Sequence, residues 1–345
     1  MIAFVEHAGG EPDRLSLEAL ALARGVASTL GVSLDAVLLG TGAEAAASRL
    51  GTYGVGLAHV AAAATFDDYA PAAWAAAIRH VIDARAPAAV VAAGSERGNE
   101  VLAHVAARAR LPMAANVIEV TPGGGAASGA ATGSSTDAAT RWAGGWSLVR
   151  QRWAGSLLED AVLVAPVHLM TVAPHAVAVD PAATNAPAPT VSAFEPAIAP
   201  ADLVARVVGR EARASAGVAL TDARVVVGGG RGVGSAEGFA KLQVLADQLG
   251  GAVGGSRVVT SLGWRPHADQ IGQTGLRIAP DLYIACGISG AIQHIVGCKA
   301  AKRILAINTD QDSPIMAVAD YAVIGDLNVV VPAISAEIER RTTAG

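Results

Sequence analysis

At 345 residues, of which 52% are apolar, the chain is long enough to form two domains that each bury a large core. The formal net charge of −5 and the low aromatic content of 4% argue against a surface that binds nucleic acid. No run approaches about twenty uncharged apolar residues, so we expect no direct insertion into a membrane.

Apolar strands alternate with helical stretches through the N-terminal half. The expected strands are Ile2–Val5, Leu34–Leu39, Leu57–Ala62, Ala88–Ala93 and Ala114–Val120, and the expected helices are Leu15–Leu30, Ala43–Leu50, Pro71–Ala84 and Arg97–Arg110. This alternation predicts a doubly wound α/β domain. The segment after Ala93 resembles a nucleotide-binding loop, but helix capping by Ser95 is the favoured interpretation, and we expect no ligand in this domain.

The middle of the chain is rich in small residues and proline. Thr121–Thr140 predicts a flexible loop, and Arg141–Val149 and Val162–Val172 predict two strands. The Pro- and Ala-rich segment Pro181–Pro200 predicts a connection between domains, and we expect the domains to span residues 1–205 and 206–345. Three tryptophans are candidates either for the core or for an interface, namely Trp142, Trp146 and Trp153.

The most informative stretch spans residues 282–294. Leu282–Ile288 predicts a buried strand, and Gly290–Ala301 predicts a helix with Ile292, Ile295 and Val296 on its packed side. The junction would leave backbone amides free to bind a phosphate. From this segment alone, an ordinary strand-to-helix turn with a core histidine at His294 is an equal alternative.

Other strands in this half also end in glycine or polar residues. Arg224–Gly234 is a strand that enters a glycine loop containing Arg231, followed by a helical pattern over Ser235–Leu249. This loop does not fit G-x-G-x-x-G, so by itself a plain glycine turn is favoured. Polar loops at 254–257 and 270–275 could surround a planar ring. Two later strands end at Asn308 and Asp326, where such sheets contact adenosine and ribose, although either residue could instead cap a helix.

Taken together, these motifs resemble the alpha, or large, subunit of electron transfer flavoproteins. The resemblance covers residues 282–308, with the helix start 289–294 and the closing Ala306–Asn308 in register. It also includes Gly229–Gly232, Ser256–Arg257, Gln270–Gly275 and the segment from Ala319 to Pro332, and it extends more weakly to Met1–His7. It implies a C-terminal Rossmann-like domain with a parallel sheet that binds FAD.

The resemblance implies one noncovalently bound FAD in this subunit. The residues implied to bind it are Arg231, Ser256, Arg257, Gln270, Ile271, Gly272, Gln273, Thr274, Ser289, Gly290, Ala291, Ile292, Gln293, His294, Asn308, Asp326 and Leu327. Arg257 and His294 would stabilise negative charge on the flavin ring, and the Thr274 hydroxyl would reach N5. No catalytic residue and no metal site are expected.

The implied function is that of an electron carrier without substrate turnover of its own. It would take single electrons from flavin dehydrogenases, such as the acyl-CoA dehydrogenases of fatty acid oxidation, and pass them to a membrane quinone oxidoreductase or another acceptor. A smaller beta subunit would complete a heterodimer and hold AMP or a second FAD. Swivelling of the C-terminal domain is a further hypothesis. The alternatives are an NAD(P)-binding, transhydrogenase-like module and a nucleotide-binding partner without redox chemistry.

Cysteine usage is sparse, with only Cys286 and Cys298 in the chain. Neither belongs to a C-x-x-C motif, so we expect no disulfide, zinc site or iron–sulfur centre, and both side chains are interpreted as core residues. The sequence starts directly with a strand rather than a secretory or organellar leader, which favours the bacterial cytoplasm.

Overall fold

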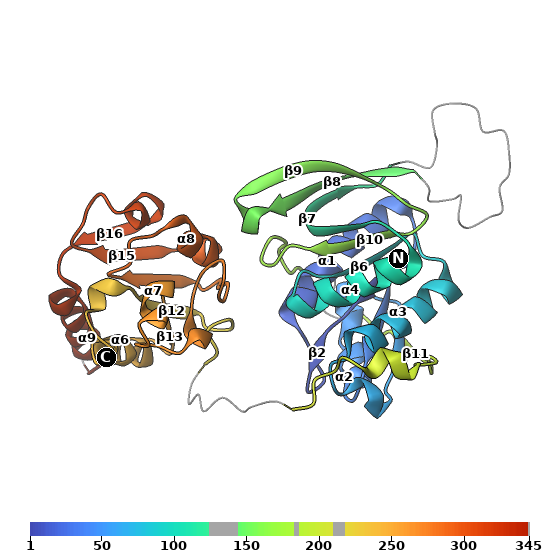
Figure 1. Cartoon of the computed structure of the whole chain (residues 1–345), viewed down its shortest axis with the longest axis horizontal. Coiled ribbons are helices and arrows are strands. Elements are labelled where there is room, and N and C mark those ends of the chain that lie inside the picture. The colour runs from blue at the N-terminus through green and yellow to red at the C-terminus, as the bar shows by residue number, and fades with distance from the viewer. Residues whose placement is uncertain (124–143, 183–185, 210–217, 344–345) are drawn as a thin grey trace. The chain divides into compact units, whose positions relative to one another are not determined.

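The computed structural model describes residues 1–123, 144–182, 186–209 and 218–343. Contacts within the chain divide it into two compact units, Met1–Glu211 and Ala212–Gly345. Each unit is an α/β domain built on its own parallel-rich sheet, so the expected fold class is confirmed (Figure 1).

The described residues of the first unit form a nine-stranded sheet with the order β11-β5-β4-β1-β6-β10-β7-β8-β9. Its strands are β1 (Ile2–Phe4), β4 (Asp35–Leu39), β5 (Leu57–Ala61), β6 (Ala89–Ala93), β7 (Met113–Thr121), β8 (Gly145–Arg152), β9 (Leu157–Val164), β10 (His168–Val172) and β11 (Thr190–Ala193). All neighbouring strands run parallel except in the pairs β7–β8 and β8–β9, which are antiparallel. A small hairpin joins β2 (His7–Ala8) to β3 (Glu11–Pro12).

Successive side chains of each strand point to opposite faces of the sheet, and helices cover both faces, so a separate core forms on each face. The helices are α1 (Arg14–Leu30), α2 (Ala43–Ser48), α3 (Pro71–Arg85) and α4 (Glu96–Ala109). Ala3 and Val5 pack in the core that contains α1 and α2, whereas Ile2 and Phe4 pack in the core that contains α3 and α4. The Ser95 side chain accepts a hydrogen bond from the Gly98 N–H at 2.8 Å, which confirms that it caps α4.

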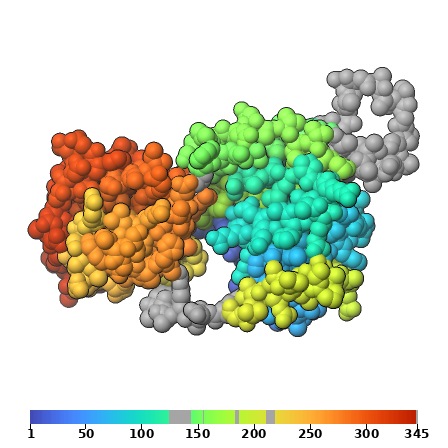
Figure 2. Space-filling view, in the orientation of Figure 1, coloured from blue at the N-terminus to red at the C-terminus, as the bar shows by residue number. Residues whose placement is uncertain are grey.

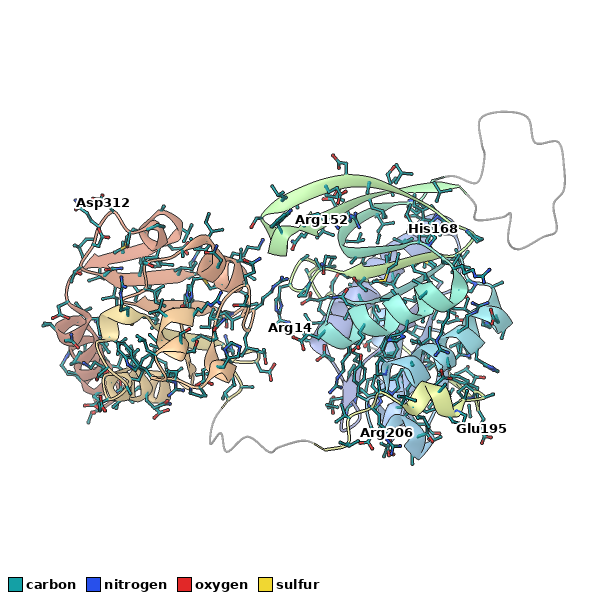
Figure 3. All side chains as sticks on the ribbon, viewed as in Figure 1. Arg14, Arg152, His168, Glu195, Arg206 and Asp312 are labelled. Atoms are coloured by element: carbon teal, nitrogen blue, oxygen red, sulfur yellow. The ribbon has the colours of Figure 1, made fainter. Side chains whose placement is uncertain are left out.

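The prediction of one strand over Val162–Val172 was wrong. Two strands occupy this region: β9 pairs antiparallel with β8, whereas β10 lies parallel between β6 and β7. Pro166 stands between them and has no N–H to donate to a ladder. The long hairpin of β8 and β9, drawn in green in Figures 1 and 2, therefore forms one edge of the sheet, and Arg152 lies at its turn (Figure 3).

The segment Pro181–Pro200, predicted as a connection between domains, also contributes a strand to the first sheet. Within it, β11 adds a parallel edge strand beside β5, and the Asp202 carboxylate just beyond it pairs with Arg108 of α4. Most of the loop expected over Thr121–Thr140 lies outside the described residues, as does Trp142. Trp146 is a core residue whose ring stacks on His168 at 4.1 Å between centroids.

The second unit has a five-stranded parallel sheet with the order β13-β12-β14-β15-β16. Its strands are β12 (Val225–Gly229), β13 (Ala252–Gly255), β14 (Leu282–Cys286), β15 (Ile304–Asn308) and β16 (Tyr321–Ile324). Its helices are α6 (Phe239–Gln248), α7 (Arg257–Ser261), α8 (Ile292–Cys298) and α9 (Leu327–Thr343). The helices α6 and α9 contribute to the core on one face, and α8 contributes to the core on the other.

Several element ends differ from the predictions, and glycines with left-handed backbone angles lie near them. Gly234 has φ +89°, and α6 starts only at Phe239 rather than at Ser235. Gly287 has φ +62° and ends β14 before Ile288. The helix predicted over Gly290–Ala301 shortens to the seven residues of α8, and Ile292 is 69% exposed rather than packed.

Both cysteines are free and buried, in β14 and at the end of α8. Burial raises the pKa of each thiol to about 12. No helix in the described part of the chain is both long enough and apolar enough to cross a membrane.

Candidate functional site

A cavity of about 810 Å³ opens at the carboxyl ends of the strands in the second unit. It lies where the strand order reverses between β12 and β14, the usual ligand position in doubly wound sheets. The predicted site residues that line it are Arg231, Ser256, Arg257, Gln270, Ile271, Gly272, Gln273, Thr274, Ser289, Gly290, Ala291, Gln293, His294 and Asn308. Three others, Ile292, Asp326 and Leu327, lie outside its lining.

The loop after β14 presents free backbone donors. The N–H groups of Ser289, Gly290 and Ala291 donate to no residue that the structure describes. Gly290 has φ +77°, and a Cβ there would lie 2.4 Å from the Ile315 nitrogen, so only glycine fits. Because α8 is short, these loop amides, rather than a helix dipole, make the junction suitable for an anion.

Two arginines give the cavity a positive charge. Arg231 follows β12, and Arg257 is the first residue of α7. Both are exposed, and neither side chain forms an ion pair with another described residue. Asp310 is the single acidic residue among those that line the cavity. The balance of charge therefore favours an anionic ligand.

His294 is buried at the wall of the cavity. Its Nε2 lies 2.8 Å from the Tyr283 hydroxyl, whereas its Nδ1 has no hydrogen-bond partner of good geometry among the described residues. Burial lowers the pKa of His294 to about 4, partly offset by the Ile271 carbonyl. The imidazole is therefore neutral at pH 7 and carries a single N–H. Tyr283 was not anticipated, because it lies within an apolar strand and gives no polar signal in the sequence.

A second network holds the loop between β13 and β14. The Thr260 hydroxyl lies 2.9 Å from Gln270 Oε1, and Gln270 Nε2 lies 2.9 Å from the Thr274 hydroxyl. The loop rests directly on α8, because a Cβ at Gly297 would lie 2.3 Å from the Gly272 nitrogen. Thr260 was also missed in the sequence, since nothing in its segment indicates a partner ten residues away.

Asn308 and Asp326 have different roles. The Asn308 amide donates to the Ile288 carbonyl at 3.0 Å, which joins two loops at the cavity wall. Asp326 accepts from the Asn328 N–H at 2.8 Å, so it caps α9, one of the two roles considered for it. Leu327 is buried in the core beside α6.

A doubly wound sheet with a large cavity at its switch point, free loop amides and unpaired arginines is typical of proteins that bind an anionic nucleotide-like ligand. Comparison with known families refines this class. The electron transfer flavoprotein domain matches residues 1–199, and the electron transfer flavoprotein FAD-binding domain matches residues 219–299. The chain belongs to the electron transfer flavoprotein alpha-subunit family.

Similarity to curated relatives extends over nearly the whole chain. The electron transfer flavoprotein subunit alpha of Syntrophomonas wolfei is 33% identical over 339 residues, which cover 98% of this chain and 98% of the relative. The subunit of the same name from Mycobacterium leprae is 35% identical, covering 99% of this chain and 98% of the relative. That of Bacillus subtilis is 31% identical, covering 99% and 97%.

Proposed function

We propose that this chain is the FAD-carrying subunit of a heterodimeric electron transfer flavoprotein and that its cavity holds the FAD. The observation that carries this proposal is the convergence of free loop amides, unpaired arginines and a neutral buried imidazole on one cavity of about 810 Å³. Such a set suits a ligand with a pyrophosphate at one end and a polar ring at the other. FAD, when bound, supplies the ability to take up and release electrons one at a time.

The loop after β14 would hold the pyrophosphate. The three free N–H groups at Ser289, Gly290 and Ala291 can each donate to a phosphate oxygen without breaking any hydrogen bond of the described chain. Arg231 adds a permanent positive charge from the loop after β12. This arrangement stabilises negative charge while leaving the loop backbone unchanged.

The residues at the other end would contact the ring. Arg257 contributes a fixed positive charge, and His294 offers a neutral hydrogen-bond donor because its buried imidazole resists protonation. Together they would lower the energy of negative charge at the N1 and C2 carbonyl edge of the flavin. The Thr274 hydroxyl can donate or accept, so it can serve N5 in either protonation state.

A beta subunit would complete the heterodimer, with AMP or a second FAD bound in it. One observation in the first unit supports a partner surface: the outward face of β9 exposes Leu158 by 65%, Val162 by 67% and Val164 by 61%, and Trp153 at the turn before β9 is 75% exposed. Flavin dehydrogenases would donate electrons to this complex, and a quinone oxidoreductase or another acceptor would receive them. The chain would not turn over a substrate of its own.

The test is to purify the chain together with its beta subunit and to titrate the complex with reductant while its absorbance is recorded. We expect one FAD per pair in this subunit and a one-electron stage with the red absorbance of the anionic form. Arg257→Gln should weaken FAD binding at least about tenfold, because it removes a charged contact. Arg206→Gln is the matched control, since Arg206 is an exposed arginine in the first unit (Figure 3).

The proposal fails if the purified pair neither contains nor takes up FAD in this subunit. Direct two-electron reduction of the complex by NADH, with no one-electron stage, would instead support the NAD(P) alternative. Equal FAD affinity in Arg257→Gln and Arg206→Gln would exclude the assigned role of Arg257.

A further inference from the structure

Three side chains form a continuous hydrogen-bonded row beside the cavity. Thr260 lies on α7, Thr274 lies at the cavity wall, and the Gln270 amide joins them. Its Oε1 lies 2.9 Å from the Thr260 hydroxyl, and its Nε2 lies 2.9 Å from the Thr274 hydroxyl. Gln270 is only 1% exposed, so water does not compete for its amide group. The three residues belong to one network, and the hydrogen-bond direction at one end constrains the direction at the other.

The backbone around Gln270 is held in place. The Ile271 N–H donates to the Gly255 carbonyl at 2.8 Å, and the Leu276 N–H donates to the Gln270 carbonyl at 2.7 Å. The backbone of Gln270 therefore cannot shift without breaking main-chain hydrogen bonds on both sides. Within the row, rotation of the terminal amide of Gln270 exchanges the positions of its oxygen and its nitrogen.

Thr260 has a choice of acceptors that makes two arrangements possible. Its hydroxyl lies 2.9 Å from Gln270 Oε1 and 3.0 Å from the Arg257 carbonyl, yet it has only one proton to donate. When that proton points to Gln270, the Gln270 amide donates to Thr274. When it points to the Arg257 carbonyl, Thr260 can accept from the turned amide, whose oxygen then accepts from Thr274.

We propose that Gln270 is a positioning residue that, with Thr260, sets the direction of the Thr274 hydroxyl at the cavity. In the first arrangement Thr274 receives a hydrogen bond from Gln270 and directs its own proton into the cavity. In the second, Thr274 donates to Gln270 and presents a lone pair to the cavity. The Thr274 hydroxyl can therefore act toward the cavity as either a donor or an acceptor, and in both arrangements every polar group of the row keeps a partner.

This inference rests on the proposed function and extends it to the protonation of the flavin. An unprotonated N5 needs a donor, whereas an N5 that carries a proton needs an acceptor. Thr274 can match both states because Gln270 and Thr260 turn with it. No covalent bond forms or breaks in the row: each hydroxyl keeps its proton, and the proton on N5 comes from solvent.

Two substitutions should lock the row in opposite directions. Above its pKa, which burial raises, the Gln270→Glu carboxylate only accepts, so Thr274 must donate to it and can offer the cavity only a lone pair. Thr260→Val removes the partner of Gln270 Oε1. Because an unpaired buried N–H is tolerated less often than an unpaired carbonyl, the Gln270 amide should then keep donating to Thr274.

The measurement is the absorbance of the FAD-loaded heterodimer at the one-electron stage of a reductive titration, recorded across pH. The red form lacks the N5 proton and the blue form carries it. We expect Gln270→Glu to raise the ratio of blue to red about tenfold at a given pH, and Thr260→Val to lower it, since each locks one hydrogen bond of ordinary strength. Thr260→Ser keeps the hydroxyl and should behave as the wild type.

A separate variant controls for the negative charge that Gln270→Glu adds. Ser261→Glu adds a carboxylate to the cavity wall without replacing a residue of the row, so it should change the ratio less than Gln270→Glu does. An equal change in these two variants would overturn the relay, as would equal behaviour of Thr260→Val and Thr260→Ser. If all variants bind FAD and keep the wild-type ratio, the relay alone is wrong. If the wild-type pair binds no FAD, both proposals are overturned.

Discussion

Acid should destabilise the second unit through His294. Burial lowers the pKa of this imidazole from an ordinary 6.5 to about 4, so the unfolded chain takes up a proton at a higher pH than the folded chain does. The contribution to stability is therefore fully present above pH 6.5 and is lost as pH falls toward 4. A shift of this size corresponds to about 3 kcal/mol of unfolding free energy, at roughly 1.4 kcal/mol per pKa unit.

Two measurements test this reasoning. The imidazole resonance that disappears in His294→Gln identifies the residue in NMR spectra, and its titration should have a midpoint near 4. Urea unfolding at several pH values should lose less stability on acidification in His294→Gln than in the wild type. His267→Gln, at an exposed histidine of the same unit, should keep the wild-type pH dependence. A His294 midpoint near the ordinary value, or identical pH dependence in all three proteins, would refute the argument.

Three further tests probe packing, a buried hydrogen bond and helix capping. Gly297→Ala places a Cβ 2.3 Å from main-chain nitrogen, so it should cost about 1–3 kcal/mol in urea unfolding and weaken FAD binding. Gly25→Ala, with open space inside α1, should instead stabilise by up to about 1 kcal/mol, and equal effects would contradict the packing argument. Tyr283→Phe leaves the buried imidazole nitrogen without its partner and should cost about 1–3 kcal/mol, whereas wild-type stability would exclude that hydrogen bond. Ser95→Ala should cost about 1–2 kcal/mol by thermal or urea unfolding, and an equal loss in Ser95→Thr, which keeps the hydroxyl, would count against capping.

The elements whose periodicity is local were predictable from the sequence. The strands β1, β4, β5 and β6 and the helices between them were predictable because apolar runs alternate with amphipathic stretches. The pattern within each segment is enough to indicate its type. Pro166 marks the break between β9 and β10, but the apolar residues of Val162–Val172 do not show that the two strands pair with different neighbours. The strand β11 was missed for the same reason: Thr190–Ala193 extends because β5 offers it an open edge.

The site residues also divide into those that the local sequence predicts and those that depend on the fold. Residues that follow strand ends, such as Arg231 and Asn308, could be predicted because parallel strands bring their carboxyl ends to one edge. Thr260 and Tyr283 could not, because their roles depend on contacts with segments brought near them by the fold. The exposure of Ile292 was mispredicted because the start of α8 depends on the loop that precedes it.

The two units also show why one switch point suits an anionic ligand better than the other. In the first unit the strand order reverses between β1 and β6, where the Glu6 carboxylate accepts a hydrogen bond from Ser95, and burial raises the pKa of Glu6. In the second unit Gly230 and Gly287 follow the equivalent strands. A phosphate at the first switch point would displace Ser95 and meet a carboxylate, whereas at the second it would meet glycine backbone and two arginines. The difference in charge and bulk at equivalent positions of the same topology therefore favours the second unit as the site of the dinucleotide.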